Sequence, residues 1–157
     1  MALPNGYDYA AGDLATLILR RFYPERTDRE STIIRDYLLA HGGEFDRFSF
    51  SVRVGQGQTP DPTNLPGVQE NAVFSSRKRI DLLAWRGNQP VIVEVKERVT
   101  PASLGQILTY RQLWHEEHPE APPPELVVIG RFSDDDTIRS LNTNGVSVLL
   151  YDPAATA

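Results

Sequence analysis

Residues 80–96 read IDLLAWRGNQPVIVEVK, two apolar runs separated by a short polar turn. Runs of this length, rich in Ile, Leu and Val and separated by Gly-Asn, predict two antiparallel strands joined as a β-hairpin. If the Gly-Asn pair forms the turn, Asp81 lies directly opposite Glu94. Side chains alternate along a strand, so Lys96 shares the face of Glu94. The hairpin therefore gathers two carboxylates and one ammonium group at one place on a sheet.

These charges conflict with their apolar surroundings. Two carboxylates that face each other between strands repel, and a buried charge without a partner costs several kcal/mol. A divalent cation would resolve the conflict, because Mg²⁺ binds one or two carboxylates and completes its shell with water and phosphate oxygens. Lys96 would then lie where it can activate the attacking water and stabilise charge on phosphorus. The alternative is a surface ion-pair cluster in which Lys96 and Arg79 neutralise Asp81 and Glu94. We favour the metal site, because the rest of the hairpin is apolar.

The elements around the hairpin are predicted from hydrophobic periodicity and capping residues. Asp28 is the expected N-cap of the second helix, and residues 55–76 are expected to form a long loop or an extended hairpin tip. Strands alternate with helices after the hairpin, which predicts parallel strands there and antiparallel strands before it. The predicted fold class is therefore α/β, with a central mixed β-sheet flanked by α-helices. Helices are expected at about 13–22, 28–40, 100–118 and 133–144, and further strands at about 48–54, 126–129 and 146–151.

The composition limits the class of protein. The chain has 157 residues, of which 40% are hydrophobic and 24% charged, as expected for one globular domain. No apolar run approaches the ~20 residues that span a bilayer, and the first residues lack signal-peptide features, so we expect a cytoplasmic protein without a membrane partner. Cysteine is absent, which excludes disulfide partners and thiolate metal sites. The net charge of −5 argues against a general nucleic-acid coat but allows an enzyme with a local basic patch.

The arrangement of Asp81, a short hairpin and Glu94-Val95-Lys96 resembles the PD-(D/E)xK nuclease superfamily, which has the restriction-endonuclease-like fold. The resemblance implies that Asp81 and Glu94 bind Mg²⁺, for which Mn²⁺ can substitute, and that the backbone carbonyl of Val95 is a further ligand. It also implies that Lys96 assists hydrolysis of DNA phosphodiester bonds by a metal-activated water. Ile80 stands where the family motif has proline, a departure that leaves the ligands intact. The alternative function is a non-catalytic module that retains the fold and binds nucleic acid or protein.

The resemblance covers most of the chain. The family core, which consists of a helix, the hairpin, a crossover helix and a strand, corresponds to residues 28–130. Residues 1–27 are then an N-terminal helical extension, and residues 131–157 are a C-terminal helix and strand of the same single domain. DNA is the expected substrate, and a homodimer would suit a chain of this size that must engage two strands.

Three further residues match features of Holliday-junction-resolvase-like and RecB-like members. Many of these nucleases carry a glutamate on the first core helix, and Glu30 is the candidate for this catalytic and metal-binding acid. Alternatively, Glu30 only stabilises the first turn through the helix dipole. Gln106 and Tyr110 resemble the Gln-x-x-x-Tyr of RecB-like members and lie one turn apart on a helix. Either could orient Lys96 or a phosphate, or belong to an ordinary helix surface.

A basic run, Arg77, Lys78 and Arg79, leads into the strand that carries Asp81. Such a run is usually a solvated face. Its place beside the proposed metal site favours contacts with DNA phosphates instead. We therefore expect the DNA-binding surface to include the start of this strand.

Overall fold

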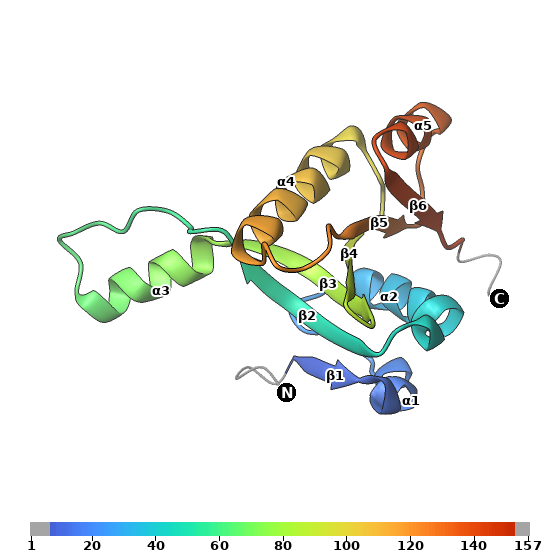
Figure 1. The fold of residues 1–157 in the computed structure, drawn as a ribbon, viewed down its shortest axis with the longest axis horizontal. Helices are drawn as coiled ribbons and strands as arrows, with labels where there is room; N and C mark the ends of the chain where they lie inside the picture. Colours follow the sequence, from blue (N-terminus) through green and yellow to red (C-terminus); the bar gives the residue numbers. More distant parts are fainter. Residues whose placement is uncertain (1–6, 153–157) are drawn as a thin grey trace.

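A six-stranded β-sheet forms the centre of the molecule in a computed structural model that describes residues 7–152 (Figure 1). The strands lie in the order β1-β2-β3-β4-β5-β6, so each pairs with its neighbours in sequence. The pairs from β1 to β4 are antiparallel, whereas β4, β5 and β6 run parallel. The mixed sheet predicted from the sequence is therefore confirmed. The strands are β1 (Asp8–Ala10), β2 (Arg47–Val54), β3 (Lys78–Arg86), β4 (Gln89–Val95), β5 (Glu125–Gly130) and β6 (Val146–Leu150).

Helices cover both faces of the sheet (Figure 1). The helix α2 packs against one side, here called the α2 face, while α4 and α5 cover the opposite α4 face, so the core forms two clusters. The short helix α1 contacts α2, and α3 belongs to the segment between β2 and β3. No helix in the described residues is both long and apolar enough to span a membrane. The helices are α1 (Leu14–Ile18), α2 (Asp28–His41), α3 (Pro66–Ser76), α4 (Pro101–Glu117) and α5 (Asp135–Thr143).

The hairpin of β3 and β4 has the register predicted from its turn. Its strand pairing begins with Arg86 and Gln89, which flank the two turn residues, and ends with Leu82 and Val93. Gly87, the first turn residue, has a φ of 58°, a left-handed conformation that glycine adopts without steric cost. One step beyond the last pair, this register brings Asp81 beside Glu94. The turn length therefore determines where the two acids meet.

The alternation predicted for β2 is correct only as far as Phe50. Phe48 and Phe50 belong to the core of the α2 face, but Val54 belongs to the core of the α4 face and Val52 packs against it. Ser51 separates the two halves. Its φ of 53° lies in the left-handed region, so the strand reverses its faces at this residue. The residue pattern could not reveal this reversal, because apolar and polar types continue to alternate through it.

Residues 7–27, the described part of the segment expected as a helical extension, contribute to both the sheet and the core. Asp8–Ala10 form β1 beside β2, a strand too short for periodicity to predict. Leu17 and Tyr23 are buried together with the apolar side chains of α2. The predicted helix ends with α1, well before Phe22, which is half exposed. These residues therefore form part of the central fold.

The segment 55–76, expected as a loop or hairpin tip, contains the helix α3. None of the residues of α3 is buried, and Figure 1 shows the helix lying away from the sheet. Pro66 occupies the first turn, a preferred place for proline. A helix without a buried face needs no apolar stripe, so periodicity did not predict it.

Candidate active site

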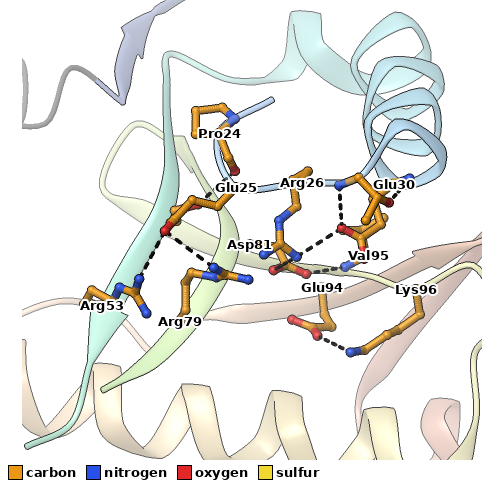
Figure 2. Close-up of polar contacts among 12 residues, drawn as sticks. Pro24, Glu25, Arg26, Glu30, Arg53, Arg79, Asp81, Glu94, Val95 and Lys96 are labelled. Atoms are coloured by element: carbon orange, nitrogen blue, oxygen red, sulfur yellow. Dashed lines mark hydrogen bonds and ion pairs between the residues drawn. The ribbon is translucent and has the colours of Figure 1, made fainter. Parts of the chain in front are cut away.

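Two acids from neighbouring strands lie side by side within the sheet (Figure 2). Asp81 on β3 and Glu94 on β4 are 4% and 2% exposed. The backbone N–H of Val95 donates to Asp81 Oδ2 at 2.9 Å. Lys96 Nζ lies 3.3 Å from Glu94 Oε1. The structure thus brings together the two carboxylates and the lysine that the hairpin predicted.

Burial makes both carboxyl groups hard to ionise. Loss of hydration and the neighbouring Asp81 charge raise the pKa of Glu94 to about 8, against the opposing effect of Lys96. Burial also raises the pKa of Asp81, although the Arg26 guanidinium and the Val95 N–H act in the opposite direction. Glu94 Oε2 is buried and accepts no hydrogen bond from the described residues. A cation at this oxygen would supply the interaction that it lacks.

Arg26, which no sequence pattern indicated, forms an ion pair with Asp81. Its Nη1 atom lies 2.6 Å from Asp81 Oδ1 and 3.4 Å from Glu30 Oε2, and its side chain is 6% exposed. Figure 2 shows the guanidinium in contact with both carboxylates. Its Nε atom is buried and has no hydrogen-bond partner in the described part of the chain. Nothing in the sequence marked Arg26, because it lies in an irregular segment far along the chain from the hairpin.

Contacts around two residues with strained backbone hold the segment of Arg26 in place. Glu25 and Ser51 are the two non-glycine residues with positive φ within residues 7–152, at 57° and 53°. Ser51 Oγ donates to the carbonyl of Pro24 at 3.0 Å, and Glu25 forms ion pairs with arginines of β2 and β3 at 3.2 and 3.6 Å. A left-handed conformation costs about 1–2 kcal/mol in such residues and persists only where surrounding contacts enforce it. These contacts therefore fix the segment that carries Arg26 to the aspartate.

Glu30, expected either as a metal-binding acid or as an acid that stabilises a helix, lies in the first turn of α2. The Glu30 N–H donates to Thr27 Oγ1 at 3.2 Å, and Glu30 Oε2 accepts from the Thr27 N–H at 3.2 Å, which forms a capping box. Thr27 is thus the N-cap, and the prediction of Asp28 was wrong by one residue. Glu30 and Asp81 share the Arg26 guanidinium, whose Nη1 atom contacts both carboxylates. Among the described residues, no three His, Asp or Glu side chains lie close enough to hold one metal ion.

The helix α4 brings Gln106 and Tyr110 to one hollow of the surface. Burial raises the pKa of Tyr110, and the charges of Glu94 and Asp81 raise it further. The hollow has a volume of about 250 Å³. Its lining residues are Lys78, Ala102, Gly105, Gln106, Thr109 and Tyr110. The two residues of the Gln-x-x-x-Tyr pattern therefore share a wall that also carries a lysine.

The three residues of the basic run make different contacts. Arg77 Nε donates to the carbonyl of Gly55 at 2.7 Å, so this guanidinium holds the chain just after β2. Arg79 Nη1 lies 3.6 Å from Glu25 Oε1, so Arg79 pairs with this glutamate rather than with the acids of the site. Lys78 is exposed and forms no ion pair within the described residues. Of the three, Lys78 has the cation that is available to an anionic ligand.

No protein-family model matches the sequence, and no curated protein matches it either. The structure is similar to the crystal structure of a repair endonuclease from Pyrococcus abyssi, with a TM-score of 0.50 and 13% sequence identity. The alignment covers 84% of this chain and 50% of that protein, so the chain spans half the length of the endonuclease. At this identity the likeness concerns the fold. The predicted α/β fold, a restriction-endonuclease-like mixed sheet flanked by helices, is therefore confirmed.

Proposed function

We propose that the chain is a Mg²⁺-dependent deoxyribonuclease of the PD-(D/E)xK type, which hydrolyses phosphodiester bonds of DNA. The observation that carries the proposal is the buried pair of Asp81 and Glu94 with Lys96 beside it. Opposed acids destabilise a sheet, whereas a divalent cation and a phosphate would stabilise this arrangement. The likeness of the fold to that of a repair endonuclease supports the same class of reaction.

The atoms present suit Mg²⁺ or Mn²⁺. Carboxylate oxygens are the ligands that these hard cations prefer, and Glu94 Oε2 lacks a hydrogen-bond partner among the described residues. Asp81 offers a second carboxylate, and the backbone carbonyl of Val95 is a third candidate donor. Glu30 is a more distant candidate, because Arg26 lies against its Oε2. A bound ion would lower the pKa of a coordinated water and so supply the nucleophile.

The side chains around the acids have roles that follow from their positions. Lys96 is 36% exposed and its ammonium is 3.3 Å from Glu94, so it connects the buried acid with solvent. From there its Nζ can donate to the attacking water or to a phosphate oxygen and stabilise the charge of the transition state. Gln106, Tyr110 and Lys78 offer an amide, a hydroxyl and an ammonium to the phosphates that flank the scissile bond.

The contact between Arg26 and Asp81 favours a second candidate function. An arginine 2.6 Å from the aspartate neutralises it without a metal ion, as it would in a module that binds nucleic acid or protein without cleaving it. We prefer the nuclease, because a purely structural cluster would leave Glu94 Oε2 buried without a hydrogen-bond donor from the described residues. Such an atom destabilises a fold unless a ligand satisfies it.

Cleavage of a panel of nucleic acids tests the proposal. Duplex, single-stranded, flap and four-way-junction DNA, together with RNA, are incubated with Mg²⁺, Mn²⁺ or EDTA. We expect metal-dependent cleavage of a DNA form, and Asp81→Ala, Glu94→Ala and Lys96→Ala should each reduce its rate at least ~100-fold. Glu120→Gln removes an exposed acid after α4 and is the control. Binding without cleavage in every condition would favour the second candidate, and full activity of Asp81→Ala would contradict the first.

A further inference from the structure

The four carboxyl oxygens of Asp81 and Glu94 differ in their contacts (Figure 2). Asp81 Oδ1 lies 2.6 Å from Arg26 Nη1, and Oδ2 accepts from the Val95 N–H at 2.9 Å. Glu94 Oε1 lies 3.3 Å from Lys96 Nζ, and Oε2 has no hydrogen-bond partner among the described residues. Each Asp81 oxygen already has one partner, so a cation that binds both acids would lie next to either the Arg26 guanidinium or the Val95 N–H.

Of these two contacts of Asp81, the ion pair with Arg26 is the one that a cation can displace. The Val95 N–H belongs to the backbone of β4, which pairs with β3 on one side and β5 on the other. The guanidinium is the end of a long side chain, and a cation on the same carboxylate would repel it. Its hydrogen bonding is also incomplete, because the buried Nε has no partner in the described part of the chain.

A second acceptor already lies within reach of the guanidinium. Glu30 Oε2 is 3.4 Å from the same Nη1 atom of Arg26. The capping box with Thr27 anchors Glu30, so Glu30 keeps its place if the arginine moves. The contacts of Glu25 hold the backbone next to Arg26, so a side-chain rotation is enough. If Arg26 leaves Asp81 and stays with Glu30, the buried guanidinium remains paired and avoids the cost of an isolated charge.

We propose that Arg26 competes with a divalent cation for Asp81 and thereby sets the metal affinity of the site. Arg26 holds both Asp81 and Glu30 until the ion binds, and then leaves Asp81 and keeps its ion pair with Glu30. This inference rests on the proposed function, because it takes Asp81 and Glu94 as the metal ligands. It assigns Glu30 the task of receiving the displaced arginine rather than ligating the ion.

Calorimetric titration of the full chain with MnCl₂ measures this competition. A charge within about 4–6 Å shifts the protonation equilibrium of a carboxylate tenfold or more, and it should act on metal binding in the same way. Arg26→Gln removes the charge and should therefore bind Mn²⁺ at least about tenfold more tightly than the parent. Arg139→Gln is the matched control, because Arg139 is exposed and pairs with Asp136 on α5 and not with Asp81. Its affinity should stay within about twofold of the parent value.

The outcomes separate this inference from the proposed function. Tighter binding by Arg26→Gln and not by Arg139→Gln supports the competition. Equal or weaker binding by Arg26→Gln, with a parent that binds Mn²⁺, would overturn the inference and leave the proposed function intact. Equal tightening in both variants would also overturn it, because the effect would then come from net charge. If neither the parent nor Arg26→Gln binds Mn²⁺, the metal site of the proposed function fails, and the inference fails with it.

Nuclear magnetic resonance of the parent covers the case in which Arg26→Gln does not fold. The ¹⁵N-labelled chain is titrated with MgCl₂, and the Arg26 Nε–H signal is assigned by its absence in Arg26→Lys. This signal should shift in step with the Val95 amide, whose N–H contacts Asp81. A shift at Val95 without a change at Arg26 would overturn the inference, because the arginine would have stayed in place. No shift at either group would overturn the metal site as well.

Discussion

Replacing Asp81 with asparagine should destabilise the protein in EDTA, although the change removes one of two like charges. Asp81 pairs with Arg26 at 2.6 Å, and their side chains are 5% and 6% exposed. Removal of one partner from a buried ion pair costs about 3–5 kcal/mol, because the other charge stays buried. Glu30 compensates part of this loss, because its carboxylate lies 3.4 Å from the same Arg26 atom. The expected net loss of about 2–4 kcal/mol lowers Tm by roughly 4–16 °C for a chain of this size.

Replacing Glu94 with glutamine should have the opposite effect. Its pKa is raised from 4.5 to about 8, so the folded protein holds this proton more tightly than the unfolded chain. The parent therefore loses stability as the pH rises from about 4.5 to about 8, and the loss is complete above that range. The full shift corresponds to about 5 kcal/mol at about 1.4 kcal/mol per unit. Because glutamine forfeits the ion pair with Lys96, we expect a gain of about 1–3 kcal/mol at high pH.

Thermal denaturation in EDTA from about pH 5 to about pH 9 measures both effects. Asp81→Asn should melt below the parent near neutral pH. The Glu94→Gln curve should meet the parent near the acidic end and rise above it toward pH 8. Glu120→Gln, an exposed acid, should follow the parent throughout. If Asp81→Asn melts at or above the parent temperature, the stabilising ion pair with Arg26 is refuted. If the difference in Tm between Glu94→Gln and the parent does not grow with pH, the cost of ionising Glu94 is refuted.

Other changes test the site through binding and stability. Lys78→Ala should weaken DNA binding and reduce the salt slope of log affinity by about one unit in anisotropy titrations, whereas Arg77→Gln should mainly lower Tm. About millimolar Mg²⁺ should raise the Tm of the parent by mass action, and Glu94→Gln should lose most of that increase in the same melts. Gly130→Ala should lower Tm in circular-dichroism melts, because a Cβ there would lie 2.5 Å from the carbonyl oxygen of Lys96, a backbone atom that cannot easily move aside.

The hairpin and its acids were predictable because both depend on local information. A two-residue turn sets the register of a hairpin, and alternation then places Asp81 beside Glu94 and Lys96 on the same strand face. The parallel half of the sheet was predictable for a similar reason, since helices between strands require crossover connections. The capping signal at the start of α2 was also visible, although it placed the N-cap one residue late.

The contacts that complete the site were not predictable, because they depend on tertiary packing. Arg26 reaches Asp81 from an irregular segment, and no periodic pattern marks such a residue. The face reversal at Ser51 is set by its hydrogen bond to Pro24, which only the folded chain brings close. The helix α3 escaped prediction for a different reason, since no face of it is buried.

Several unfavourable features of the described residues lie near this hairpin. The strained residues Glu25 and Ser51 flank the contact of Arg26 with the sheet. Two of the buried side-chain atoms without partners in the described residues, Glu94 Oε2 and Arg26 Nε, belong to the same cluster. One is an acceptor and the other a donor, so neither a lone cation nor a lone anion satisfies both. Under the proposed function, a metal ion with its phosphate ligand brings a cation to the acid and an anion to the arginine. A structural salt-bridge cluster gives no reason for both atoms to stay unpaired, and strain of this kind is typical of functional sites.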